Sequence, residues 1–161
     1  MVSIKGTRRN RKESWRVEKM NIIISRGKSI DSGEWMFGFY AFKELNSHHE
    51  HFIIKETIAA QNYNPSYFTD YLVIPETVGR GMPKIKNLQI FEGDIFEFDG
   101  KSAVVKYGEY TLFTGQEHFG FYLDWGSMKD SYRNDILFWI KEREGKIIGT
   151  IYDDIYKERI K

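Results

Sequence analysis

The sequence contains no cysteine and only three prolines. Without cysteine the chain can form no disulfide, no thiolate metal site and no cysteine nucleophile, and a reducing cytoplasm is the expected compartment. No run of about 18 apolar residues occurs, so we expect no segment that crosses a membrane. The chain begins with basic residues, but no apolar stretch follows them, so no conventional secretory signal is expected.

The chain also lacks the common catalytic and nucleotide-binding signatures. It has no Gly-Lys-Ser/Thr phosphate loop, no Gly-x-Ser-x-Gly nucleophile elbow and no Rossmann fingerprint. We therefore expect a protein that acts by binding rather than by a familiar enzymatic reaction, with no catalytic residue and no cofactor.

Aromatic residues are abundant. They make up 16% of the 161 residues, and aromatic and β-branched residues favour strands. Hydrophobic residues account for 41% and charged residues for 29%, which is typical of a folded globular chain and too apolar for a disordered one. The length suits one domain, or one domain with an extension. The composition predicts a mainly β fold.

Charge is divided unevenly along the chain. Residues 1 to 19 hold seven basic and two acidic residues, whereas the remainder holds 17 basic and 21 acidic residues. A basic arm of this kind binds nucleic-acid phosphates by releasing counterions, or it is a solvated tail or extension. We therefore divide the chain into a basic N-terminal arm or extension, residues 1–19, and a β-rich domain, residues 20–161.

The clearest local pattern is a predicted β-hairpin. Two short apolar runs, Ile95–Phe98 and Ala103–Tyr107, flank Asp99-Gly100. Glycine adopts a positive φ angle at low cost and aspartate tolerates one, so this pair suits a tight turn between two strands.

Four carboxylates lie in and just before this hairpin. They could act as acid–base groups or metal ligands. An aspartate in a bend, however, more often accepts hydrogen bonds from the backbone. We therefore favour a turn-forming Asp94 and a solvent-facing Glu97 over a catalytic site. The four are Glu92, Asp94, Glu97 and Asp99.

Before the hairpin, the chain reads as short strands joined by long loops. Asn21–Ser25 is an apolar run consistent with a buried strand that Arg26-Gly27-Lys28 would close. Glu34–Phe42 alternates with aromatic residues on both faces, so we expect a strand sandwiched in the core. The polar stretch Leu45–Glu50 is predicted to be a loop. A single helical turn or tight bend is expected at Glu76–Gly79.

After the hairpin, the pattern is partly ambiguous. Tyr110–Phe113, Phe119–Leu123 and Lys146–Tyr152 are predicted strands. The continuous apolar run within Asp135–Glu144 does not distinguish a helix from a strand. Little helix is therefore expected in total.

The stretch His48-His49-Glu50-His51 is the strongest candidate for a metal site. Imidazole and carboxylate groups suit zinc, and His49 and His51 would share one face of an extended strand. No fourth ligand is apparent, and an exposed polar loop explains the same residues. We therefore predict no metal site.

Two groups of basic residues are the candidate ligand-binding positions. In the first, cations lie close in sequence to Trp35, whose ring could stack a base while the cations hold its phosphate. The second group lies in the connector Arg80–Asn87. Its basic side chains could bind an anionic ligand, or they could only keep the loop exposed to solvent. The predicted ligand-binding residues are Arg26, Lys28, Trp35, Arg80, Lys84 and Lys86.

Five motifs follow one another along the chain, over about residues 20 to 152. In order, they are Arg26-Gly27-Lys28, Asp31-x-Gly33-Glu34-Trp35 with Gly38, Pro75-Glu76-Thr77-Val78-Gly79, Phe91-Glu92-Gly93-Asp94-Ile95, and Ile148-Gly149-x-Ile151-Tyr152-Asp153. Together they resemble the YopX family of small bacteriophage and prophage proteins, found mostly in Gram-positive bacteria. The chain departs from the family at Arg80–Asn87. The family usually carries there a Gln-aromatic-Thr-Gly-Leu segment with a following Asp and Gly, whereas this segment is shorter and more basic.

The resemblance implies a compact barrel-like or sheet domain that self-associates, and it implies no reaction. We therefore expect a non-enzymatic phage accessory protein in the host cytoplasm, with no membrane partner. In its specific form it is a homo-oligomer that sequesters a host component in pockets between subunits. That component would be a nucleotide signal of antiphage defence or a host protein. The alternative is a nucleic-acid-binding module that uses residues 1–19 and exposed aromatic residues.

Overall fold

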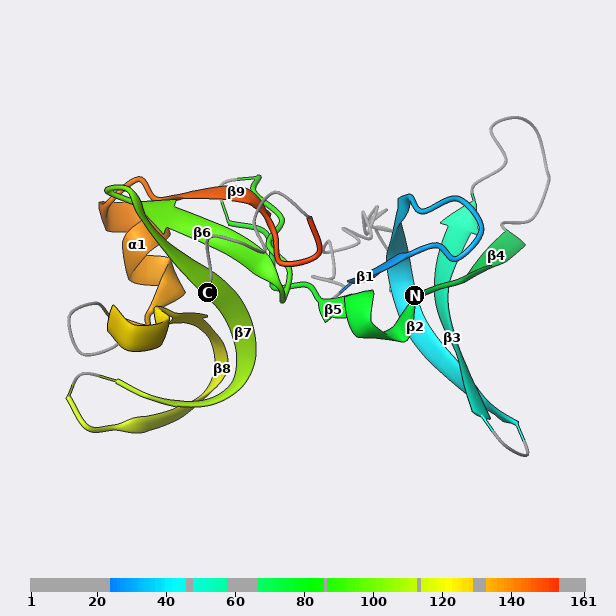
Figure 1. The fold of residues 1–161 in the computed structure, drawn as a ribbon, viewed down its shortest axis with the longest axis horizontal. Helices are drawn as coiled ribbons and strands as arrows, with labels where there is room; N and C mark the ends of the chain where they lie inside the picture. The colour runs from blue at the N-terminus through cyan, green and yellow to red at the C-terminus, as the bar shows by residue number, and fades with distance from the viewer. Residues whose placement is uncertain are drawn as a thin grey trace, which may run out of the picture.

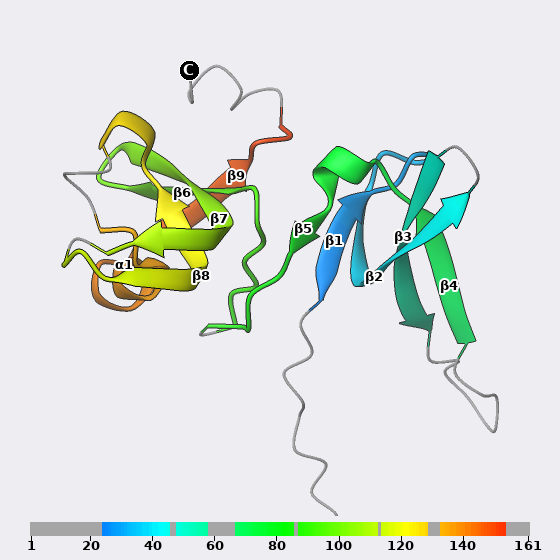
Figure 2. The same ribbon diagram turned by 90° about the horizontal axis from the view of Figure 1, so that it is seen from below.

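The computed structural model describes residues 24–45, 48–57, 67–85, 87–112, 114–128 and 133–153. These residues form two antiparallel β-sheets and one α-helix, so the mainly β fold with little helix is confirmed. The sheets form two lobes (Figures 1 and 2), and neither is closed into a barrel. Residues 1–23 lie outside the described residues, so the basic arm and the boundary at residue 20 stay predictions.

The first sheet has five strands in the order β4-β3-β2-β1-β5. Its centre is a long hairpin in which β2 and β3 pair from Phe39–Ile54 to Leu45–His48. A bridge between Ser29 and Val73 ties the residue after β1 to the residue after β4, so the sheet curls. The strands are β1 (Ser25–Lys28), β2 (Trp35–Leu45), β3 (His48–Thr57), β4 (Tyr67–Leu72) and β5 (Gly79–Arg80), and the predicted helical turn is confirmed as η1 (Pro75–Thr77).

The first strand lies further along the chain than predicted. Arg26-Gly27-Lys28, expected to end a strand, lies within β1. A Cβ at Gly27 would lie 2.9 Å from Val73 Cγ2, so glycine is needed where the curled sheet approaches itself. Gly27 therefore does not end the strand; it allows β1 to pack closely against Val73. Of the predicted strand Asn21–Ser25, residues 21–23 lie outside the described residues.

The predicted loop Leu45–Glu50 is wrong at both ends. Leu45 ends β2 and His48 begins β3, so the polar residues belong to a hairpin. Polar side chains are compatible with strands there because this end of the hairpin is largely exposed to solvent.

The expectation of a sandwiched aromatic strand is also wrong. The side chains of Phe37, Phe39, Tyr40 and Phe42 on β2 are between 40% and 62% exposed. Cross-strand pairing places two of them with apolar residues of β3 and β4 on one side of the sheet. We call the apolar part of this surface the aromatic face; it consists of Phe37, Phe39, Phe52, Ile54, Phe68 and Leu72, and the same side also carries Ala41 and the exposed Asp70.

The second sheet contains the predicted hairpin. Asp99 and Gly100 have φ angles of 50° and 67°, as a two-residue type I′ turn requires, and the prediction is confirmed. The strand order is β8-β7-β6-β9, and β7 extends to include the start of the separately predicted strand at Tyr110–Phe113. The strands are β6 (Asp94–Phe98), β7 (Lys101–Thr111), β8 (Glu117–Asp124) and β9 (Lys146–Thr150).

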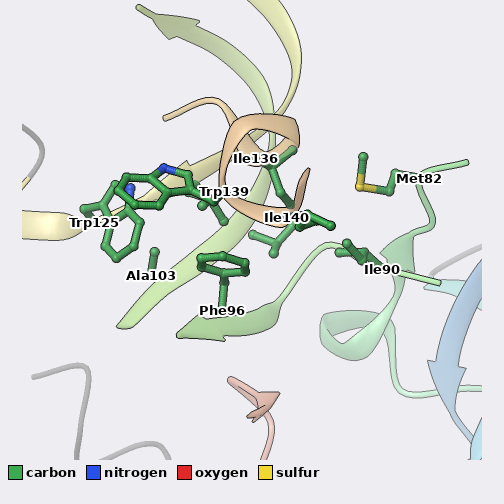
Figure 3. Packing of buried hydrophobic residues seen from close by; sticks show 10 residues of the cluster. Met82, Ile90, Phe96, Ala103, Trp125, Ile136, Trp139 and Ile140 are labelled. Carbon is green, nitrogen blue, oxygen red and sulfur yellow. The ribbon is translucent and has the colours of Figure 1, made fainter. Parts of the chain in front are cut away.

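A short helix covers one side of this sheet and resolves the ambiguous apolar run. Helix α1 (Ile136–Glu142) follows the 3₁₀ turn η2 (Gly126–Met128), and Asp135 caps it by accepting hydrogen bonds from the N–H groups of Leu137 and Phe138. Its buried residues pack on the sheet in the main core (Figure 3), which comprises Met82, Ile90, Phe96, Ala103, Val105, Leu123, Trp125, Ile136, Trp139 and Ile140. No helix in the described ranges is long and apolar enough to cross a membrane.

Candidate ligand-binding site

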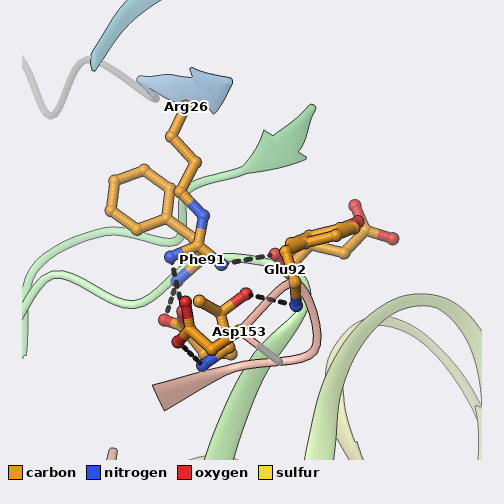
Figure 4. A network of polar contacts seen from close by, with 7 residues as sticks. Arg26, Phe91, Glu92 and Asp153 are labelled. Atoms are coloured by element: carbon orange, nitrogen blue, oxygen red, sulfur yellow. Dashed lines mark hydrogen bonds and ion pairs between the residues drawn. The ribbon is translucent and has the colours of Figure 1, made fainter. Parts of the chain in front are cut away.

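A buried ion pair joins the two sheets. Arg26 on β1 places Nη1 2.6 Å from Asp94 Oδ1 on β6, and both side chains are less than a tenth exposed. Arg26 Nη2 also donates to the backbone carbonyl of Glu92 at 3.2 Å (Figure 4). The guanidinium lies 4.5 Å from the ring centre of Trp35 and 5.0 Å from that of Phe91. Arg26 is thus engaged with protein groups on several sides, and it connects the lobes.

Asp94 has the turn-forming role that the sequence predicted. Its Oδ2 accepts a hydrogen bond from the Phe91 N–H at 2.8 Å, so that prediction is confirmed. Burial raises the pKa of Asp94, although the nearby Arg26 and the Phe91 N–H oppose the increase. Glu97, expected to face solvent, is partly buried and lies 3.6 Å from Lys146 Nζ, because β9 pairs beside β6.

An open pocket of about 250 Å³ lies beside this junction. One wall is the middle of β7, and the others come from the chain before β5, before β6 and after β9. We call it the junction pocket. It is lined by Val78, Glu92, Gly93, Val104, Val105, Lys106, Tyr107, Tyr122, Ile151 and Tyr152.

Tyr152 connects this pocket to the first predicted group of ligand-binding residues. Its ring centre lies 5.9 Å from that of Trp35, and Lys28 Nζ lies 5.8 Å from the Trp35 ring centre. The structure therefore brings Arg26, Lys28 and Trp35 together behind one wall of the pocket. Burial raises the pKa of Tyr152, so its phenol stays neutral near pH 7 and can donate a hydrogen bond.

Arg80 on β5 is exposed and lies beside the pocket, next to the lining residue Tyr107. Its Cζ is 4.1 Å from the ring centre of Tyr107, a cation–π arrangement. Lys106, the preceding residue of β7, places Nζ 2.5 Å from Asp124 Oδ2. That hydrogen bond raises the pKa of Lys106, which therefore stays cationic at neutral pH. The Arg80 cation thus lies on the Tyr107 side of β7, whereas the Lys106 side chain leaves the opposite face.

Two predicted ligand-binding residues, Lys84 and Lys86, are not placed at the pocket by the described part of the structure. Lys84 is exposed, and no described contact joins it to the lining residues. Lys86 lies outside the described residues.

Sequence reasoning missed Lys106, Tyr107 and Tyr122, because their positions depend on how far β7 extends beyond its partner. Tyr152 had a signal, since it lies in the last of the five motifs.

The histidine cluster does not form a metal site in the part of the chain that the structure describes. No group of three or more histidine, aspartate or glutamate side chains there could hold a metal ion. His51 Nδ1 is 2.7 Å from the Tyr40 hydroxyl, and His49 Nε2 is 3.9 Å from Glu44 Oε1. These side chains form an exposed polar and aromatic surface on the hairpin.

No family model, curated protein or solved structure matches this chain. The resemblance to the YopX family stays a prediction from the five motifs, and the structure shows where these motifs lie in the fold. Arg26, Trp35 and Asp94 meet at the junction, each from a different motif. Gly79 belongs to a fourth, and a Cβ there would lie 2.5 Å from the Glu92 carbonyl oxygen. Tyr152 supplies the fifth. All five motifs thus converge on the junction and its pocket.

Proposed function

We propose that this protein is a non-enzymatic, YopX-like phage accessory protein that binds a small nucleotide in the junction pocket. The observation that carries the proposal is an open pocket lined by Lys106, Tyr107, Tyr122 and Tyr152, with the Arg80 guanidinium against the Tyr107 ring beside it. Sequestration of a host nucleotide signal is the specific role we favour, because the YopX-like motifs suggest a phage origin and converge on this pocket.

The lining residues suit the three parts of a nucleotide. Arginine binds phosphate through charge-assisted hydrogen bonds, which Arg80 can supply from its position beside the lining residue Tyr107. Tyrosine rings stack bases, and three tyrosines line the pocket: Tyr107, Tyr122 and Tyr152. The carboxylate of Glu92 suits ribose hydroxyl groups, which donate hydrogen bonds to it.

Replacing Arg80 with alanine is expected to weaken nucleotide binding about tenfold or more, because a charged hydrogen-bond donor and the ring contact are both lost. Isothermal titration calorimetry with AMP, cyclic nucleotides and ADP-ribose measures the affinity. Lys84→Ala is the matched control, since it removes an exposed cation of the same segment away from the pocket. The proposal fails if no nucleotide binds the wild type, or if the nucleotide is recovered as a degraded product.

We also propose that the protein is a homo-oligomer that buries the aromatic face. Phe39 and Phe68 on this face are 43% and 64% exposed, and apolar surfaces of this kind commonly mark association sites. The double variant Phe39→Ser and Phe68→Ser is expected to be monomeric at concentrations where the wild type is not. Light scattering after gel filtration measures the mass, with Phe119→Ser on the second sheet as the control. A monomeric wild type, or an oligomeric double variant, contradicts this proposal.

A further inference from the structure

Strand β7 continues well beyond its partner β6. It runs from Lys101 to Thr111, whereas its ladder with β6 covers only Lys101 to Val104. One more hydrogen bond, from the Gly93 N–H to the Val105 carbonyl at 2.8 Å, follows that ladder. Past this point, the edge of β7 that faced β6 has no described strand beside it.

The pairing on both sides of β7 fixes which backbone groups point to this open edge. In an antiparallel strand, the N–H and C=O of one residue point to the same side, and successive residues alternate. The Val105 carbonyl points toward the β6 side, so the N–H and C=O of Tyr107 point there too. At the far end of the hairpin, Leu112 N–H donates to the Gln116 carbonyl on the β8 side, which agrees with the same alternation. No described group is hydrogen-bonded to the main chain of Tyr107 on the open side.

The junction pocket lies at this open edge. Its lining includes Lys106 and Tyr107, whose side chains leave opposite faces of the sheet. A pocket that touches both must reach around the edge of the strand, where the main-chain groups of Tyr107 lie. The pocket therefore offers one hydrogen-bond donor and one acceptor from the backbone, side by side.

We propose that the main-chain N–H and C=O of Tyr107 bind the hydrogen-bonding edge of a nucleobase. This inference rests on the proposed nucleotide function and specifies which part of the ligand enters the pocket. Adenine fits the pair, because its N6 amino group donates to the carbonyl and its N1 accepts from the N–H. Other bases that carry a neighbouring donor and acceptor belong to the same ligand class. Arg80, which lies on the Tyr107 ring, is then left for the phosphate.

The size of the open edge favours a single ring over a peptide strand. Glu92 and Tyr152 line the pocket together with residues of β7, and its volume of about 250 Å³ suits a base rather than several residues. Beyond Tyr107, Gly108 and Gly120 face each other across the hairpin, both with φ angles of 156°. That conformation is unfavourable for residues other than glycine.

Amide hydrogen exchange, followed by NMR, tests the inference in the full-length protein. In the free protein the Tyr107 amide should exchange faster than the Lys106 amide, which faces the paired strand β8. Saturating AMP should slow the Tyr107 amide. The monophosphate of purine riboside, which lacks the N6 amino group, should bind about three- to tenfold more weakly than AMP. Replacing the Tyr107 N–H with an ester oxygen should also weaken AMP binding, whereas the same change at Glu109, outside the pocket, should not.

The outcomes separate this inference from the proposed function. If AMP binds but the Tyr107 amide is unaffected and both ligands bind equally, the inference is overturned and the nucleotide function stands. If no nucleotide binds, both are overturned. A Tyr107 amide that is slow to exchange in the free protein, or one that is slowed by added strand-forming peptides and not by AMP, overturns the inference by itself.

Discussion

Replacing Arg26 with methionine is expected to lower the free energy of unfolding by about 3–5 kcal/mol at pH 7, because it leaves a buried carboxylate without its partner. Asp94 is 3% exposed, and Arg26 is its ion-pair partner. The same substitution also removes the cation that lies between the rings of Trp35 and Phe91. Urea unfolding followed by tryptophan fluorescence measures the loss. Lys28→Met, on the same strand, is the control and should change stability by less than about 0.5 kcal/mol.

The loss should also depend on pH, with a defined sign. Burial raises the pKa of Asp94 in the folded state above its ordinary value of 3.8, and Arg26 opposes that increase. Removing Arg26 must therefore raise the pKa further. A folded state with the higher pKa binds the proton more tightly than the unfolded state, so stability falls as pH rises between the two values. The deficit of the Arg26→Met variant should thus shrink as the solution is acidified below pH 7.

A second substitution checks that the unpaired charge is the cause. Combining Arg26→Met with Asp94→Leu removes both charges, and the double variant should be more stable than Arg26→Met alone at pH 7. A loss below about 1 kcal/mol for Arg26→Met, or a loss that does not change with pH, would contradict the role of this pair as the connection between the sheets.

Replacing Phe96 with alanine is expected to cost about 3–5 kcal/mol, through lost burial and the cavity that remains. Phe96 is fully buried at the centre of the main core, and its ring centre lies 6.1 Å from that of Trp125 in an edge-to-face arrangement. Chemical denaturation monitored by circular dichroism measures the loss. Phe98→Ala is the comparison on the same strand and should cost less, because Phe98 is only partly buried.

Gly145 provides a test of the same packing from the opposite side. A Cβ at Gly145 would overlap Phe96 Cζ, so Gly145→Ala should destabilise the wild type by about 1–3 kcal/mol. In the Phe96→Ala background the clash is absent, and the same substitution should cost much less. Equal costs in the two backgrounds would show that these residues are not packed as described.

The hairpin around Asp99-Gly100 could be predicted from the sequence because its cause is local. Two residues with positive φ angles, between apolar runs, determine both the turn and its register. The apolar run at Ile136–Ile140 could not be assigned in the same way. Helix α1 is decided by its cap at Asp135 and by the sheet that its buried face covers, which the run itself does not specify.

The predicted burial of the β2 aromatic residues was wrong, and only some predicted binding residues lie near the pocket, because both features depend on contacts between segments far apart in the chain. Whether Phe37 and Phe39 are buried depends on what covers their sheet, and alternation reports only that they share a face. Trp35 and Arg80 were predicted as binding residues from nearby charge. Each lies next to a residue that lines the pocket, Trp35 next to Tyr152 and Arg80 next to Tyr107. The ion pair between Arg26 and Asp94 spans 68 positions in the chain, so no local pattern could indicate it.

The most direct test of the nucleotide-binding account is to identify what occupies the junction pocket. The protein is purified under mild conditions, incubated with AMP and the other candidate nucleotides, and examined by native mass spectrometry. We expect an intact nucleotide bound to the wild type and to Lys84→Ala, and a clear loss of that species for Arg80→Ala. A wild type that retains no nucleotide from the set, or that releases a cleaved product, would contradict the account.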